Sequence, residues 1–144
     1  MGAVRLCRLC IPEMRKVGGG RIINITMIAA KQPGAKGVPT AVSRAAGIAL
    51  TKALSKDYAA ENILVNTVCV GIIRSGQWER RFEKVKGQYA SIDDYYQERA
   101  QGVPMKRFGE AGEVANLVAF LASARAAYIT GDAINIDGGT SNVV

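Results

Sequence analysis

The fold is decided by residues 21–56, which read RIINITMIAAKQPGAKGVPTAVSRAAGIALTKALSK. Arg21 to Thr26 is a short β-branched run behind the turn Gly18-Gly19-Gly20, and it predicts a buried strand. Residues 29–39 hold two prolines and two glycines, which predict a long, shaped loop. Small and apolar residues then recur with helical spacing, so a helix is expected from Pro39 or Thr40 to about Ala59. This order of strand, loop and helix is typical of an α/β protein.

The rest of the chain continues the same pattern. Gly2 to Val17 and Glu110 to about Ser123 have the spacing of amphipathic helices. Ile63 to Cys69 and Ala133 to Ile136 are short apolar runs, typical of parallel strands that are covered on both faces. We therefore predict an α/β fold, the C-terminal part of a Rossmann-like doubly wound sheet, with about three parallel strands and helices on both faces. At 144 residues, residues 1–144 are expected to form a single domain.

Composition argues against several classes of function. The net charge is +7, but the basic residues are scattered, and the densest group, residues 80–86, is interleaved with acids. That pattern favours a solvated helix face over a nucleic-acid interface. No apolar run reaches the ~20 residues that a membrane span needs, so we expect no membrane partner. The sequence contains no histidine, which excludes imidazole base catalysis and histidine metal ligands.

The three cysteines do not predict a metal site. Cys7 and Cys10 have C-x-x-C spacing, but they lie in a predicted helix and no second pair accompanies them. We interpret them as buried helix cysteines, which suit a reduced cytoplasm. Arg5 and Arg8 interrupt the apolar N-terminus, so no secretory signal is expected. A cytoplasmic location is the resulting prediction.

Four motifs follow one another in a familiar order. They are RIINITMIAA at 21–30, TAVSR at 40–44, LVNTVCVG at 64–71, and the segment from ITG at 129–131 to DGG at 137–139. In this order and spacing they resemble the short-chain dehydrogenase/reductase family, in its β-ketoacyl-carrier-protein-reductase-like form. The resemblance covers almost the whole chain and is to the C-terminal part of such an enzyme, because the family's glycine-rich pyrophosphate-binding turn is not found in the sequence. It implies an oxidoreductase that uses NAD or NADP on a small carbonyl or alcohol substrate.

The catalytic positions of that family are replaced here. The family's serine falls on Met27, its tyrosine on Thr40 and its lysine on Arg44. Met27 has no hydroxyl, and the aliphatic hydroxyl of Thr40 is too weak an acid to relay a proton as a phenol does. Arg44 keeps the positive charge of the family's lysine, but the tyrosine whose pKa it could lower is replaced. Thr40 and Arg44 remain the candidate catalytic residues, none of the catalytic set is intact, and we expect an enzyme that is weak or inactive in this form.

The loop after residue 70 keeps more of the family pattern. Gly71, Ile73 and Ser75 match P-G-x-[IV]-x-T, with Val70 in place of the proline. The resemblance implies that the backbone of Ile73 bonds the nicotinamide carboxamide and that the Ser75 hydroxyl touches the cofactor's phosphate region. The alternative is an ordinary loop after a strand. The choice between NAD and NADP rests in the family on residues after its second strand, which this sequence does not contain.

Two further expectations concern residues 76–103 and the partners. The resemblance implies that residues 76–103 form a lid-like helical insertion over the substrate, and the alternative is a helical pair packed on the sheet. Most of the aromatic residues gather there: Trp78, Phe82, Tyr89, Tyr95 and Tyr96. A homodimer or homotetramer is implied through the helices at 2–17 and 40–59. If the strands upstream of Ile23 are absent, its strand becomes an open edge, which favours association. Two other possibilities stay open: a non-catalytic binding or assembly module that uses this interface, and a gene fragment without an independent role.

Overall fold

The computed structural model describes residues 2–143. Each predicted helix and strand is present, with ends that differ from the prediction by one or two residues. In chain order the elements are α1 (Gly2–Lys16), β1 (Gly20–Met27), α2 (Val38–Tyr58), β2 (Ile63–Val70), α3 (Gly76–Glu83), α4 (Ile92–Ala100), α5 (Ala111–Ala122) and β3 (Ala133–Ile136). Between β1 and α2 the predicted loop begins with a short 3-10 turn, Ile28–Ala30.

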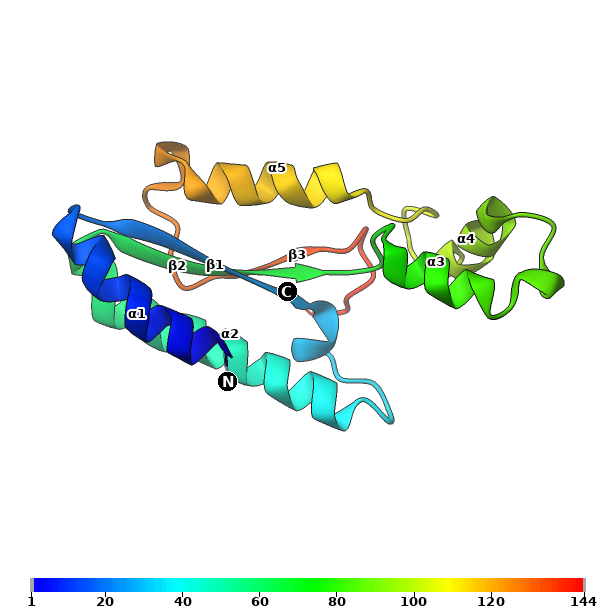
Figure 1. Ribbon diagram of the computed structural model, residues 1–144, viewed down its shortest axis with the longest axis horizontal. Coiled ribbons are helices and arrows are strands. Elements are labelled where there is room, and N and C mark those ends of the chain that lie inside the picture. Colours follow the sequence, from blue (N-terminus) through cyan, green and yellow to red (C-terminus); the bar gives the residue numbers. More distant parts are fainter. Residues whose placement is uncertain (1, 144) are drawn as a thin grey trace.

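The three strands form one parallel sheet in the order β1-β2-β3. β1 pairs with β2 along its whole length, from Gly20 opposite Ile63 to Met27 opposite Val70. β3 pairs with the second half of β2. Figure 1 shows α1 and α2 on one face of this sheet and α5 on the other. The predicted α/β architecture is thereby confirmed.

The core lies on the two faces of β2, whose residues from Ile63 to Cys69 are all buried. On the α1 and α2 face, Ile63 and Val65 pack against Cys7 and Ile11. On the α5 face, Val68 packs against Leu121. Alternate residues of one strand therefore serve two helical layers, which explains why this strand reads as continuously apolar.

The prediction that residues 21–26 form a buried strand was wrong in degree. β1 is an edge strand, paired only with β2 within residues 2–143, and Ile25 remains 55% exposed. In a doubly wound sheet such apolar side chains are covered by the helices that pack on each face, and the described helices leave Ile25 only partly covered. The outcome matches the alternative in which the strand near Ile23 becomes an open edge.

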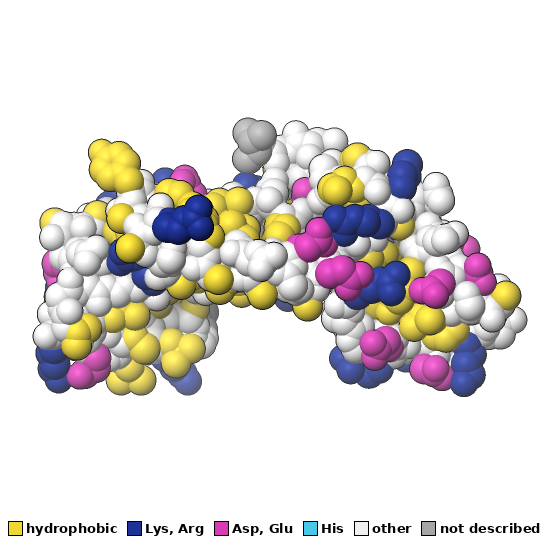
Figure 2. Space-filling model, turned by 90° about the horizontal axis from the view of Figure 1, so that it is seen from above, with side chains coloured by type: hydrophobic (Ala, Val, Ile, Leu, Met, Phe, Trp, Pro, Cys, Tyr) yellow, Lys and Arg dark blue, Asp and Glu magenta, His cyan; other side chains and the backbone are white. Residues whose placement is uncertain are grey.

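A second correction concerns the aromatic segment. Trp78, Tyr95, Tyr96 and Phe108 pack mainly on one another and form a cluster distinct from the two sheet cores. The interpretation of a helical pair packed on the sheet is therefore wrong. Figure 1 shows α3 and α4 extending beyond the end of the sheet, and Figure 2 shows them as a separate lobe.

The cysteines also differ from one another. Cys7 and Cys69 are buried, as predicted for Cys7, and burial raises the pKa of both thiols. The prediction that Cys10 is buried was wrong: it is exposed, because the buried face of α1 carries Cys7 and Ile11, four residues apart, and Cys10 lies outside that face. Within residues 2–143 no group of three His, Cys, Asp or Glu side chains is arranged to hold a metal ion. None of the described helices is both long and apolar enough to cross a membrane.

Candidate functional site

The three replaced catalytic positions lie at the ends of β1 and α2. Met27 is the last residue of β1 and pairs in register with Val70 of β2. Thr40 is exposed in the first turn of α2. One turn further, Arg44 donates to the Thr40 carbonyl over 3.4 Å. Within the described residues no hydrogen bond joins the side chains of Met27, Thr40 and Arg44, so they form no proton relay.

A cleft opens where β2 ends. Its volume is about 370 Å³, and it lies between the loop at 71–75 and the start of α3 and α5. All three residues predicted to meet a cofactor, Gly71, Ile73 and Ser75, line this one cleft. The carboxyl ends of parallel strands are where open α/β sheets bind ligands. The structure therefore brings the predicted cofactor residues together at the edge of the sheet where such a site belongs.

Ile73 lines this cleft and has backbone groups without hydrogen-bond partners in the described residues. It lies opposite Gly109 in an isolated parallel bridge, in which Gly109 donates to the Ile72 carbonyl over 3.0 Å and Arg74 donates to the Gly109 carbonyl over 2.9 Å. Such a bridge uses the groups on either side of Ile73. Its own N–H and C=O have no hydrogen-bond partner within residues 2–143.

Ser75 is a helix N-cap whose hydroxyl does not cap the helix. It precedes α3 with an extended backbone, and its side chain makes no cap hydrogen bond. Ser91 shows the usual arrangement at the start of α4, where its Oγ accepts from the backbone N–H of Asp94 over 3.1 Å. The Ser75 hydroxyl is thus available to a ligand at the positive end of a helix dipole.

Arg74 links the cleft loop to the two neighbouring helices. Its guanidinium lies 4.7 Å from the ring centroid of Tyr96 and forms ion pairs with Glu110 over 3.1 Å and Asp93 over 3.7 Å. Burial is the largest cause that raises the pKa of Tyr96 above its ordinary value. Sequence reasoning assigned no role to Arg74. In the sequence, only its position between the motif residues Ile73 and Ser75 pointed to this site.

Gly71 has a packing role that sequence reasoning did not identify. A Cβ at this position would lie 2.7 Å from the Cα of Asp137, so the backbones after β2 and β3 approach each other too closely for any other residue. Asp137 in turn accepts hydrogen bonds from the backbone N–H groups of Gly139 and Ser141. The glycine at 71 is explained by this approach, independently of any cofactor.

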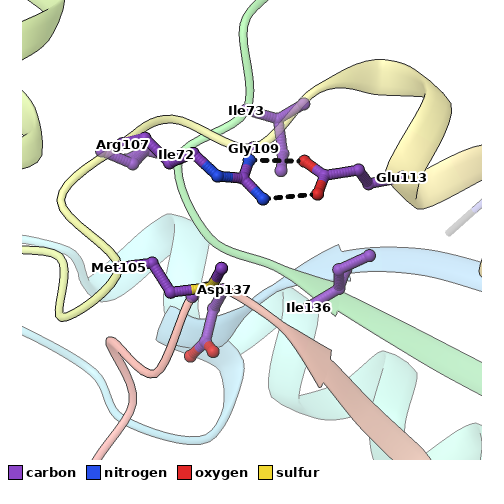
Figure 3. Close-up of a pocket in the computed structure, with 9 residues that line it drawn as sticks. Ile72, Ile73, Met105, Arg107, Gly109, Glu113, Ile136 and Asp137 are labelled. Carbon is purple, nitrogen blue, oxygen red and sulfur yellow. Dashed lines mark hydrogen bonds and ion pairs between the residues drawn. The ribbon is translucent and has the colours of Figure 1, made fainter.

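A second, smaller cavity of about 110 Å³ lies on the other side of Ile73. Figure 3 shows Arg107 and Glu113 pointing toward each other at its rim, with Met105 and Asp137 nearby. Arg107 donates two hydrogen bonds to the Glu113 carboxylate, over 2.8 and 2.6 Å. The same carboxylate accepts from the backbone N–H of Glu110 and so caps α5. The acceptors and donors here are satisfied by one another, which makes this cavity structural.

The comparisons with known proteins agree with this geometry. The sequence profile described as enoyl-(acyl carrier protein) reductase matches residues 1–141. The chain belongs to the short-chain dehydrogenase/reductase family. A curated relative, the 2-keto-3-deoxy-L-fuconate dehydrogenase of Xanthomonas campestris, is 35% identical over 140 residues, which are 94% of this chain and 45% of the relative.

Two solved structures of the family are particularly informative. The L-sorbose reductase of Gluconobacter frateurii, in complex with NADPH and L-sorbose, is 35% identical with a TM-score of 0.92 and is matched over 99% of this chain and 55% of its own. An NADPH-bound short-chain oxidoreductase of Pseudomonas aeruginosa, described as containing an atypical catalytic center, is 30% identical with a TM-score of 0.84, over 96% of this chain and 52% of its own. The chain thus spans about half the length of the relatives it matches.

Proposed function

We propose that this chain is a nicotinamide-cofactor-binding member of its family, of NAD or NADP type, whose carbonyl reduction is weak or absent. The proposal rests on the contrast between the cleft after β2 and the replaced catalytic positions. The cleft after β2 presents the free groups of Ile73 and Ser75, while Met27, Thr40 and Arg44 form no proton relay.

The residues of the cleft fit the nicotinamide end of such a cofactor. A carboxamide offers an NH2 donor group and a C=O acceptor, and Ile73, which lines the cleft, has a backbone N–H and C=O without a partner in the described residues. The Ser75 hydroxyl at the start of α3 suits a phosphate oxygen. The cofactor supplies hydride chemistry when it is bound, and this chain's residues orient its nicotinamide end.

The missing proton donor decides the level of activity. Reduction of a carbonyl needs a proton at the oxygen as the carbon is reduced, and positioned general acids contribute about 10² to 10⁴-fold. Thr40 can donate a hydrogen bond to that oxygen but cannot ionise near neutral pH. The Pseudomonas relative with an atypical catalytic center was solved with NADPH bound, which supports cofactor binding in a family member that departs from the usual catalytic residues.

Residues 76–103 are proposed as the lid over a small carbonyl or alcohol substrate. α3 starts at the cleft wall, and Trp78 lines the cleft. The lobe is joined to the sheet through the loop at 71–75 and through the bridge between Ile73 and Gly109. Its self-contained aromatic core lets it move as a unit, since few contacts tie it to the two sheet cores.

The alternative function is a non-catalytic binding or assembly module. α1 and α2 present exposed apolar side chains that no described segment covers: Leu6 at 63%, Leu9 at 71%, Val38 at 69% and Val42 at 62% exposure. Burial of such side chains against a second copy would release about 25 cal/mol for each Å² of apolar surface. We propose a homodimer or homotetramer through this face, and it is compatible with either function.

Restoration of the family's catalytic residues tests the proposal. In the variant Met27→Ser/Thr40→Tyr/Arg44→Lys, NADPH-dependent reduction of L-sorbose, the substrate named for the Gluconobacter relative, is expected to rise about 100-fold or more over the native chain. The matched control is the same variant with Thr40→Phe, which adds the ring without the hydroxyl and is expected to stay inactive. Measurable and equal turnover by the native chain and the restored variant would show that Thr40 suffices and would contradict the proposal. Inactivity of both, with NADPH bound, would favour the assembly module.

A further inference from the structure

The α3–α4 lobe holds a second cleft, which shares only Trp78 with the proposed cofactor cleft. Its volume is about 290 Å³, and it runs between the two helices. Six residues line it: Trp78, Arg81, Lys84, Val85, Tyr95 and Arg99. Three of these six are cations and three are apolar or aromatic, a combination that sets positive charge beside an apolar floor.

Two of the cations are held in place by aromatic rings. The Arg81 guanidinium lies over the Trp78 ring, 4.5 Å from its centroid, and that of Arg99 lies over Tyr95 at 5.4 Å. Stacking of this kind engages the face of a guanidinium and leaves its N–H donors free at the edges. Because the two guanidiniums come from different helices, their donors can converge on one anion between α3 and α4.

The three cations have no carboxylate partner among residues 2–143. None of Arg81, Lys84 and Arg99 takes part in an ion pair among the described residues, and the neighbour of Arg99 is the neutral hydroxyl of Tyr89. Two of the nearby acids are engaged elsewhere, because Glu83 pairs with Lys86 over 2.9 Å and Glu98 accepts from the Tyr89 hydroxyl over 3.0 Å. The rest of the lobe mixes both signs of charge, as Figure 2 shows, whereas the charged residues that line this cleft are all cations.

We propose that this cleft binds a phosphomonoester with a planar apolar group. Arg81 and Arg99 would each donate to the phosphoryl oxygens, with Lys84 as the third positive charge, which together exceed the charge of about −2 on a phosphomonoester near neutral pH. The planar group would pack against the apolar side of the cleft at Val85, beside the Trp78 ring that Arg81 covers. The site differs from the proposed cofactor site, because neither Ile73 nor Ser75 lines it, and the two clefts share only Trp78.

Phenyl phosphate is the probe for the test, since it joins a phosphomonoester to a flat apolar ring. The single tryptophan of the chain lines both this cleft and the cofactor cleft, so its emission reports binding while the variants locate it, and isothermal titration calorimetry provides a second readout. Saturable binding is expected, weakened by added salt because screening acts on exposed charges. Arg81→Gln and Arg99→Gln are each expected to lower the affinity about tenfold, the loss typical of one charge-assisted hydrogen bond.

The matched control is Arg80→Gln, which removes the same charge from the same helix at a residue outside the cleft and is expected to leave the affinity unchanged. Circular dichroism of each variant confirms that the lobe remains folded. Equal affinity of all three variants would overturn the proposal, as would the absence of saturable binding to the folded native chain at millimolar probe. Competitive displacement of phenyl phosphate by NADPH would also overturn it, because the probe would then occupy the cofactor cleft.

Discussion

Arg107 and Glu113 form a two-pronged ion pair across the turn that leads into α5. Two nitrogen atoms of the guanidinium meet two oxygen atoms of the carboxylate, and one of those oxygens also accepts from the backbone of Glu110. The pair fixes the start of α5 beside the loop at 71–75, whose residue Ile73 bridges to Gly109. A structural contact outside the proposed cofactor cleft thereby holds one wall of that cleft.

The Arg107–Glu113 pair predicts an acid-sensitive helix start. The Arg107 guanidinium is the largest cause that lowers the pKa of Glu113, from 4.5 to about 2. Because the folded-state pKa is depressed, the stabilisation is fully present above pH 4.5 and is lost as the pH falls toward 2. We expect the thermal midpoint of Glu113→Gln to fall less between pH 5 and pH 3 than that of the native chain, measured by circular dichroism. Parallel curves for the two proteins would contradict this account.

The substitution of Asn66 is predicted to cause a large loss of stability. Its side chain is 2% exposed, donates to the Ile129 carbonyl over 2.8 Å and accepts from the Asp132 N–H over 3.1 Å. Asn66→Ala leaves two buried backbone groups unpaired and is expected to lower the free energy of unfolding by about 3 kcal/mol. Asn116→Ala, at an exposed position of α5, is the control and should change the free energy of unfolding by less than about 0.5 kcal/mol. Urea denaturation measures both, and similar values would contradict the prediction.

A comparison of substitutions at Ser75 and Ser91 distinguishes a role in ligand binding from a role in helix capping. Ser91→Ala removes a cap hydrogen bond, so it should lower the free energy of unfolding by about 1 kcal/mol and leave cofactor affinity unchanged. Ser75→Ala removes a hydroxyl without a partner, so it should leave stability unchanged and lower NADPH affinity about fivefold. Thermal unfolding and cofactor titration of both variants provide the readouts. A reversal of the two patterns would assign Ser75 to capping alone.

Val42 tests the proposed self-association. It is 62% exposed on α2, where a second copy would bury it. Val42→Glu places an unpaired charge in that interface and is expected to convert the oligomer to a monomer, measured by sedimentation velocity. Gln88→Glu, in the lobe far from α1 and α2, adds the same charge and should leave the oligomer intact. An unchanged oligomer for Val42→Glu would place the interface elsewhere.

Local patterns predicted most of the fold. The β-branched run at 21–26 and the apolar run at 63–69 favour a strand over other secondary structure. The small residues of 40–59 favour a helix. Exposure was harder to predict, because it depends on neighbours in space. Ile25 reads like Val65 in the sequence, but β1 has one paired neighbour and β2 has two. The aromatic residues of α3 and α4 likewise gave no signal that they would pack on one another.

The candidate site was predicted in position but not in detail. The motif matches at Gly71, Ile73 and Ser75 located the cleft after β2. They could not show that Gly71 is required by the approach of Asp137, because that contact joins residues far apart in the chain. Nor could they show the Arg74 interactions, which depend on where α4 and α5 begin. Contacts between distant segments are the part that sequence periodicity does not encode.

Titration of the native chain with NADPH and NADH, followed by Trp78 emission and nicotinamide fluorescence, tests the central claim most directly. The claim is that the cleft after β2 retains cofactor binding although the catalytic residues are replaced. It predicts saturable binding in the micromolar range for at least one of the two cofactors. The absence of binding at millimolar cofactor, from a sample shown to be folded by circular dichroism, would contradict it.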